Sequence, residues 1–179
     1  MKFIKNLLSD LSYILGTMLG IGFIPIASGT FASIATALVW FIIPDHFFYN
    51  TIENEIFYDN YLLFMIALML FSWLSVYICT ECEKKLGHDA SSIVIDEFCG
   101  YLFAVLFLPK TIMVALYALI LFRIFDIMKP LFINKAQKLP AGWGIMLDDV
   151  LAGICSNLVL QIIYLIYKFH PIPKGSIAM

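Results

Sequence analysis

Charged residues are scarce in this 179-residue chain, in which Asp, Glu, Lys and Arg make up 13% of the sequence and hydrophobic residues make up 62%. Soluble domains usually contain about 25% charged residues. A chain of this length has too little interior to hide so much apolar surface from water. The composition therefore excludes an ordinary soluble domain and a disordered chain, and it predicts an integral membrane protein.

Positive charge is also limited, and this restricts the possible partners. Eleven Lys and Arg residues stand against thirteen Asp and Glu, which gives a net charge of −2. Nucleic-acid binding depends on a basic surface that neutralises phosphates, and this chain cannot provide one. We therefore expect membrane lipids and a lipid substrate as partners, and no nucleic acid.

Several phosphatase and metal-site signatures are missing. Arg123 is the only arginine, which excludes the lipid phosphatases that use two arginines and two histidines. No cysteine is followed six positions later by Arg, and Asp-x-Asp does not occur, so the usual motifs of cysteine phosphatases and aspartyl-phosphate enzymes are absent. Cys79 and Cys82 have no second matching pair, which argues against a zinc site.

Long apolar runs are present, and each is close to the length of a membrane-spanning helix. The third becomes long enough only if it starts near Ile93, and Pro109-Lys110 separates it from the fourth as a helical hairpin. The runs cover roughly residues 27–43, 61–79, 98–109, 111–125 and 150–167. They predict an all-α, polytopic membrane protein with about five transmembrane helices.

The N-terminal residues show a different pattern. Apolar residues repeat at helical spacing through residues 1–15 with polar residues between them, which predicts an amphipathic helix in the membrane interface. A cleaved signal peptide is the rival interpretation, although Asp10 interrupts the apolar stretch that it would need. The whole chain, 1–179, is then one membrane domain, made of this interfacial helix, a glycine-rich loop at 16–30, a helical core at 31–169 and a tail at 170–179.

The positions of Lys and Arg predict the orientation. The loop 44–60 carries four acids and neither Lys nor Arg, whereas cations gather at the N-terminus, in 80–92 and in 123–147. Placing those three regions in the cytoplasm predicts an N-terminus inside and a C-terminus outside. The most unusual polar residues then all fall at the cytoplasmic face.

Carboxylates gather at this face. Adjacent acidic pairs open the third and fifth predicted helices, and one acid closes the fourth. These residues are Asp96 and Glu97, Asp148 and Asp149, and Asp126. Acids at helix starts can simply cap helices on a solvated face. Carboxylates that converge at membrane depth instead need water, a cationic partner or a metal ion, and Mg²⁺ characteristically binds carboxylates together with substrate phosphate.

The glycine-rich segment 20–30 has two interpretations. Its backbone N–H groups can cradle a phosphate. It can equally be a linker that leads into a helix packed through the small residues Gly29, Ser33 and Ala37. The residues themselves leave both interpretations open.

Four blocks of sequence, taken in order, resemble the phosphatidylglycerophosphatase A family of bacterial membrane enzymes. They share family-like spacing between about residues 16 and 160, although Ser28 and Ala32 stand where the family usually has Pro and Gly, and Trp143 separates two glycines that are commonly adjacent. The blocks are Gly29-Thr30-Phe31-Ala32-Ser33, His88-Asp89 through Asp96-Glu97-Phe98, Phe122-Arg123 through Lys129-Pro130, and Gly144-Ile145-Met146-Leu147-Asp148-Asp149 through Gly153.

The resemblance implies a phosphatase of phospholipid biosynthesis in the bacterial inner membrane. It would hydrolyse phosphatidylglycerophosphate to phosphatidylglycerol and inorganic phosphate, with Mg²⁺, at a site facing the cytoplasm. The metal or the attacking water would be held by Asp96, Glu97, Asp148 and Asp149. Phosphate would be bound by Arg123 and Lys129, with Gly29 and Thr30. Supporting roles would fall to three more residues. Asp126 would orient these cations or join the metal shell, Asp89 would be a metal ligand or general acid, and His88 would protonate the leaving alkoxide.

The chemical step and two rival functions stay open at this point. Metal-activated water is favoured over a covalent aspartyl-phosphate, but the sequence does not decide between them. A CDP-alcohol phosphotransferase also uses clustered Asp and Mg²⁺, although its longer Asp-x-x-Asp-Gly-x-x-Ala-Arg motif is missing. A divalent-cation transporter is the second rival, but its acids would lie near mid-span.

Overall fold

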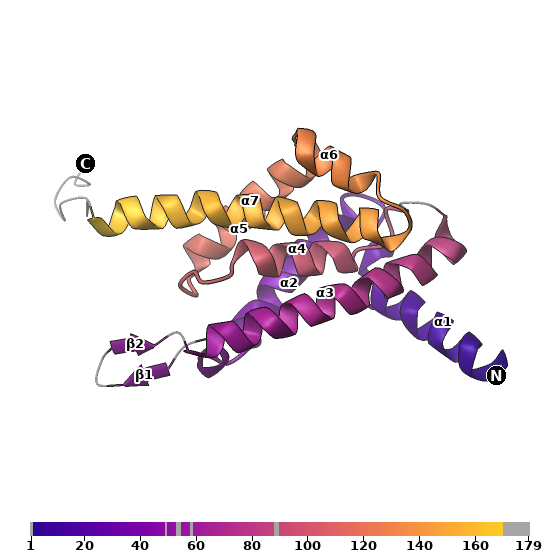
Figure 1. Cartoon of the computed structure of the whole chain (residues 1–179), viewed down its shortest axis with the longest axis horizontal. Coiled ribbons are helices and arrows are strands. Elements are labelled where there is room, and N and C mark those ends of the chain that lie inside the picture. Colours follow the sequence, from indigo (N-terminus) through magenta and orange to yellow (C-terminus); the bar gives the residue numbers. More distant parts are fainter. Residues whose placement is uncertain (1, 49, 53–54, 58, 88–89, 170–179) are drawn as a thin grey trace.

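The computed structural model describes residues 2–48, 50–52, 55–57, 59–87 and 90–169 (Figure 1). The candidate residues His88 and Asp89 and the predicted tail, 170–179, lie outside the described residues.

The described part of the chain is almost entirely helical, as predicted. It contains seven α-helices, two single turns of 3-10 helix and one short antiparallel hairpin, which the sequence patterns did not predict. In chain order the elements are α1 (Lys2–Gly16), η1 (Ile21–Phe23), α2 (Ser28–Ile42), η2 (Asp45–Phe47), β1 (Asn50–Ile52), β2 (Glu55–Phe57), α3 (Asp59–Leu86), α4 (Ile95–Ala104), α5 (Ile112–Met128), α6 (Leu131–Gln137) and α7 (Gly142–Phe169).

Two helices are long and apolar enough to cross a membrane. They are the stretches Asn60–Leu86 of α3 and Gly142–Lys168 of α7. The third predicted span is not a complete one, because α4 has 10 residues and a rise of 1.5 Å per residue makes it about 15 Å long, half of a typical hydrocarbon core. The structure therefore supports a helical membrane protein, and the number of five spans stays a prediction.

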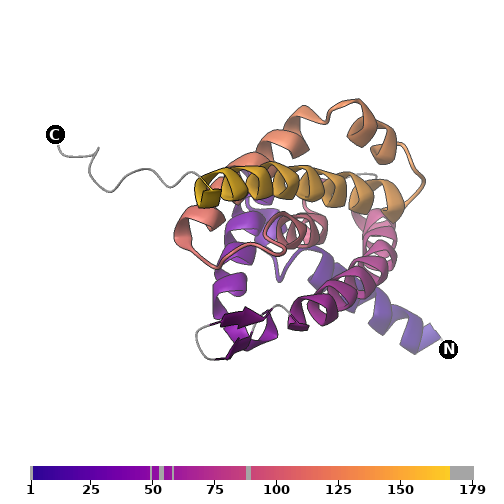
Figure 2. The same cartoon turned by 60° about the vertical axis from the view of Figure 1, so that its left-hand side comes forward.

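The short helix α4 lies at the centre of the bundle. It packs against α2, α3, α5 and α7, which surround it in Figure 2. Polar side chains from α7 bind the backbone where α4 ends: the Asn157 amide donates to the carbonyls of Ala104 at 3.0 Å and Leu106 at 2.6 Å. The Tyr61 hydroxyl of α3 donates to the Leu108 carbonyl at 3.0 Å. A helix can stop at membrane depth because neighbouring helices satisfy the carbonyls that it leaves free.

Glycines set the distance between α4 and α7. A Cβ atom added to Gly153 would lie 2.1 Å from the Gly100 carbonyl oxygen, and one added to Gly100 would lie 2.7 Å from the Asp149 carbonyl oxygen. Real Cβ atoms do not approach backbone this closely, so only glycine permits the observed contact. Small residues of this kind commonly let helices approach closely in membranes.

The connections gather at two ends of the bundle. The segment from α1 to α2, the α3–α4 connection and helix α6 lie at one end, whereas the hairpin, the α4–α5 connection and the end of α7 lie at the other (Figure 1). The predicted topology separates the same segments into two groups. Which end faces the cytoplasm stays a prediction.

Two predicted boundaries are wrong, and both move candidate residues. Helix α2 begins at Ser28, so Gly29 and Thr30 lie in its first turn and not in a loop. Helix α7 begins at Gly142, eight residues before the predicted run, so Asp148 and Asp149 lie in its second turn and do not open it. The extra turns form because the Thr80 hydroxyl of α3 accepts a hydrogen bond from the Gly142 N–H at 3.0 Å.

Helix α1 agrees with the predicted amphipathic segment. It contacts α3 through the ion pair of Asp10 with Lys85, at 2.7 Å, and leaves the side chains of Ile4, Leu7 and Leu11 exposed. An apolar stripe of this kind suits a helix in the membrane interface. That location stays a prediction.

We predict that Gly153→Ala destabilises the bundle by about 1–3 kcal/mol, because the added methyl group forces α4 and α7 apart. Thermal unfolding of the purified protein in detergent measures this. The control is Leu158→Ala, an exposed position on the same helix, which should change the melting temperature far less. Equal melting temperatures for Gly153→Ala and the unaltered protein would contradict the close glycine contact.

Candidate active site

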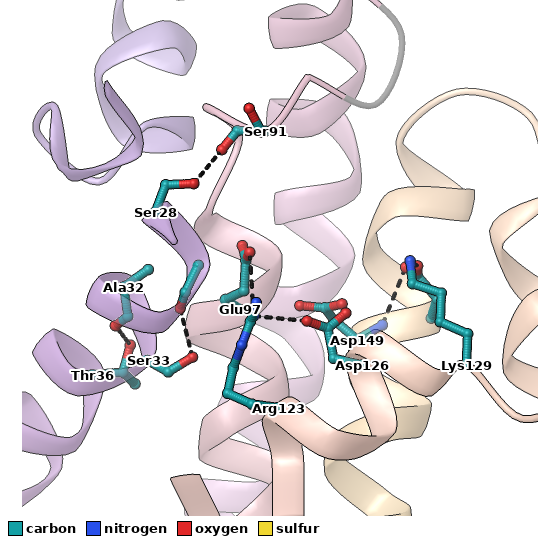
Figure 3. Close-up of polar contacts among 12 residues, drawn as sticks. Ser28, Ala32, Ser33, Thr36, Ser91, Glu97, Arg123, Asp126, Lys129 and Asp149 are labelled. Atoms are coloured by element: carbon teal, nitrogen blue, oxygen red, sulfur yellow. Dashed lines mark hydrogen bonds and ion pairs between the residues drawn. The ribbon is translucent and has the colours of Figure 1, made fainter. Parts of the chain in front are cut away.

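The candidate residues converge where α4, α5 and α7 meet, next to the N-terminus of α2. The first turn of α4 supplies Asp96 and Glu97, the end of α5 supplies Arg123 and Asp126, and the second turn of α7 supplies the acids at 148 and 149. Figure 3 shows Glu97, Arg123 and Asp126 pointing toward one another from α4 and α5. These segments are far apart in the sequence, so the site depends on tertiary packing.

Three carboxylates form the centre of the site. Oxygen atoms of Asp96, Glu97 and Asp149 all lie within 4.8 Å of one another. Asp96 is 8% exposed and Asp149 3% exposed. One oxygen of each carboxylate (Asp96 Oδ1, Glu97 Oε2 and Asp149 Oδ2) is buried and has no hydrogen-bond partner within the described part of the chain.

This arrangement fits a divalent cation. Buried carboxylates without partners are costly, and three of them at this spacing repel one another. Hard cations such as Mg²⁺ take carboxylate oxygens as ligands, so an ion between these oxygens would balance their charge. Neither acid is the N-cap residue of α4, because that position is Val94, which makes no side-chain cap hydrogen bond.

Arg123 lies beside the carboxylates. Its Nη1 atom is 2.7 Å from Asp126 Oδ2, one turn further along α5, and 3.8 Å from Glu97 Oε1. The guanidinium group is mostly buried, which strengthens its attraction to an anion. Asp126 thus holds the only arginine of the chain next to the three-carboxylate group.

Lys129 and Asp148 form a separate ion pair. The Lys129 ammonium donates to Asp148 Oδ2 at 2.5 Å. Burial alone would lower the pKa of Lys129, but the hydrogen bond and negative charge of Asp148 raise it above its ordinary value, so the side chain stays charged. Asp148 is therefore paired with a lysine, and of the four predicted metal ligands it is the one that lies outside the group of three.

Gly29 brings the start of α2 into contact with this group. A Cβ atom at position 29 would lie 2.1 Å from Glu97 Oε1 and 2.7 Å from Arg123 Nη1. A side chain at this position would therefore have to displace the ends of the Glu97 and Arg123 side chains. Both interpretations of the glycine-rich segment agree with the structure, because Gly29 and Ser33 are buried on the packed face of α2 and Gly29 also borders a cavity.

A polar cavity of about 470 Å³ opens next to the carboxylates. Glu97 and Arg123 form one wall, and the segment from Gly22 to Gly29 and the serines Ser91 and Ser92 form the others. The Ser28 hydroxyl donates to the Ser91 carbonyl at 2.7 Å and so joins the two walls (Figure 3). Gly29 lines this cavity, whereas Thr30, the other residue predicted to bind phosphate with it, does not.

The sequence patterns missed the serine wall. Ser91 and Ser92 lie between His88-Asp89 and Asp96-Glu97, but neither helical nor strand periodicity distinguishes them. Their contact with the loop before α2 is visible only in the fold: a Cβ atom at Gly22 would lie 2.0 Å from the Ser92 carbonyl oxygen.

Comparison with known proteins gives consistent results. The model of the family described as Phosphatidylglycerophosphatase A matches residues 14–164, a range that contains every candidate residue. A protein of Bacteroides thetaiotaomicron described as a putative phosphatidylinositol-3-phosphatase is 32% identical over 163 residues, which cover 86% of this chain and 94% of that protein. The Phosphatidylglycerophosphatase A of Escherichia coli is 31% identical over 154 residues, covering 84% of this chain and 82% of that protein.

A third relative is more similar over a shorter stretch. The Phosphatidylglycerophosphatase A of Haemophilus influenzae is 41% identical over 101 residues, which cover 55% of this chain and 62% of that protein. No solved structure matches the chain significantly. The family match spans most of the chain, and two of these relatives are matched over most of both sequences, so the chain belongs to the phosphatidylglycerophosphatase A family.

Proposed function

We propose that this protein is a membrane-bound, Mg²⁺-dependent phosphatase that releases inorganic phosphate from phosphatidylglycerophosphate. The observation that carries the proposal is the group of three buried carboxylates, with unpaired oxygens, beside a polar cavity that also contains Arg123. Family membership supports the phosphatase chemistry. The relatives named for phosphatidylglycerophosphate and for a phosphoinositide both suggest a phosphate monoester on a lipid headgroup.

The residues of the chain divide the work of binding and hydrolysis. Arg123 binds phosphate oxygens, and the positive end of α2 faces the same cavity, so both attract the dianionic group. Asp96, Glu97 and Asp149 would hold Mg²⁺, which would supply positive charge for the phosphate oxygens and lower the pKa of water. One carboxylate of the group would accept the proton of the attacking water as the water oxygen bonds to phosphorus and the phosphorus–oxygen ester bond breaks. The same carboxyl group would then return the proton to the departing alkoxide, which leaves as the lipid alcohol.

Lys129 and Asp148 have a positioning role in this proposal. Their ion pair connects the end of α5 to the second turn of α7, the two elements that carry Arg123 and Asp149. Because the pair is partly buried, it holds these two ends together more firmly than an exposed pair would. It thereby keeps the cation and the carboxylate at a fixed separation.

The two rival functions are less compatible with this arrangement. A cation transporter needs carboxylates along a path across the membrane, whereas these carboxylates lie toward one end of the bundle, where Glu97 borders the polar cavity. The motif of a CDP-alcohol phosphotransferase is absent from the sequence. Hydrolysis of a phosphate monoester needs only the groups that this site contains.

The first prediction of this proposal concerns the metal. The purified protein in detergent should release inorganic phosphate from phosphatidylglycerophosphate with Mg²⁺, lose this activity in excess chelator and regain it on addition of Mg²⁺. Ca²⁺ should substitute poorly because it prefers more ligands at longer distances. Full activity in excess chelator would refute the metal assignment.

The second prediction separates a catalytic role of the carboxylates from a structural one. Asp149→Asn keeps the size of the side chain and removes its charge, so the protein should insert and purify normally, but its phosphate release should fall at least ~10²-fold. The control is Asp10→Asn, which removes an exposed ion pair away from the site and should leave the rate unchanged. If Asp149→Asn matches that control, the three-carboxylate group is not the reaction centre.

The third prediction concerns orientation. We propose that the carboxylate end faces the cytoplasm and that the acidic 44–60 segment lies outside. In a variant without the native cysteines, a cysteine at position 54, outside the described residues, should react with an impermeant thiol reagent added to intact cells. A cysteine at the exposed position 138, next to α6, should react only after lysis. The reverse pattern would overturn the proposed orientation.

A further inference from the structure

An apolar groove lies next to the polar cavity, and η1 and the first turn of α4 separate the two. It has a volume of about 300 Å³ and is lined almost wholly by hydrophobic side chains from the end of α1, from η1 and from α2, α3 and α4. Its rim includes the exposed side chains of Leu19, Val39 and Phe71, so the groove opens toward the apolar surroundings of the bundle. Nothing in the catalytic proposal uses this groove.

The groove and the cavity share their wall. Ile21 lines the groove and the next residue, Gly22, lines the cavity. In the first turn of α4 the same division recurs, because Ile95 and Phe98 line the groove whereas Glu97 lines the cavity. A molecule with a polar part in the cavity and an apolar part in the groove would therefore only have to cross the η1 and α4 wall.

The cavity and the groove border successive parts of helix α2, so a molecule that occupies both would run along this helix. Gly29, at the start of α2, borders the cavity, and Ala35 and Val39, further along the same helix, border the groove. At 1.5 Å per residue these two positions lie about 9 Å and 15 Å from Gly29 along the helix axis. The groove thus begins beside the headgroup cavity and runs away from it along α2.

We infer that this groove binds one acyl chain of the phospholipid substrate while the phosphorylated headgroup occupies the polar cavity. The inference rests on the proposed function, because it assigns the second part of the same substrate. An acyl chain is the apolar group that is covalently attached to the headgroup, and the groove offers it hydrophobic contacts on the other side of the wall that borders the cavity. Affinity for the substrate should therefore depend on chain length, since each buried methylene contributes favourably.

Kinetics with two substrates test this inference. Ala35→Phe and Val39→Phe fill the groove, and Leu38→Phe, at an exposed position of α2 that is not part of the groove, is the matched control. We expect both groove variants to reduce the ratio of kcat/KM for dioleoyl over dibutanoyl phosphatidylglycerophosphate about tenfold, through KM, because they displace several buried methylenes. Leu38→Phe should leave this ratio unchanged. An unchanged ratio in both groove variants would overturn the inference, whether kcat/KM stays the same or falls equally for both substrates.

A binding measurement separates this inference from the proposed function. Phosphatidylglycerol with a photoreactive diazirine in one acyl chain should crosslink to groove residues of the unaltered protein. The crosslinks should disappear in Ala35→Phe and persist in Leu38→Phe. Groove crosslinks without any phosphate release would refute the proposed function and support the acyl site. Phosphate release without groove crosslinks would support the proposed function and refute the acyl site.

Discussion

The close contact between α4 and α7 is the constraint on which the rest of the structure depends. Gly100 and Gly153 let the two helices approach until backbone touches backbone. This brings the first turn of α4 beside the second turn of α7, and the carboxylates that these turns carry within 4.8 Å of one another. A side chain at either glycine would collide with the backbone of the other helix and push the two helices apart. Packing between small residues is therefore the physical basis of the site.

Helix α4 is also short. A helix of ten residues cannot cross a bilayer, so its last carbonyls end among apolar groups and need donors from the protein. Asn157 and Gln161 of α7 and Tyr61 of α3 provide them. The long helices thus support the half-length helix at its far end through hydrogen bonds, and at its near end through close packing. The result is a group of acidic residues that starts inside the bundle and faces a polar cavity.

Charge balance explains the surroundings of the carboxylates. Arg123 is held by Asp126 and lies near Glu97, while Lys129 is neutralised by Asp148. These pairs leave the three central carboxylates with unpaired oxygens, which is the feature expected of a cation site in a low-dielectric environment. On the other side of the wall, the surface becomes apolar within a single residue, from Gly22 to Ile21. A site with a polar and an apolar half on opposite sides of one wall suits a phospholipid better than a soluble phosphate ester.

The sequence by itself determined the helical class, the acidic and basic residues of the site and the family, because these depend on composition, helical periodicity and short motifs. It identified Asp96, Glu97, Arg123 and Asp149 without knowledge of their contacts. Only the tertiary structure decided that α4 has ten residues, that Asp148 pairs with Lys129 outside the group of three, that Gly29 lies within the first turn of α2, and that Ser91 and Ser92 line the cavity. Each of these features depends on which helices are in contact and at what distance. The hydropathy pattern of one helix does not show which side chains of the other helices will contact it.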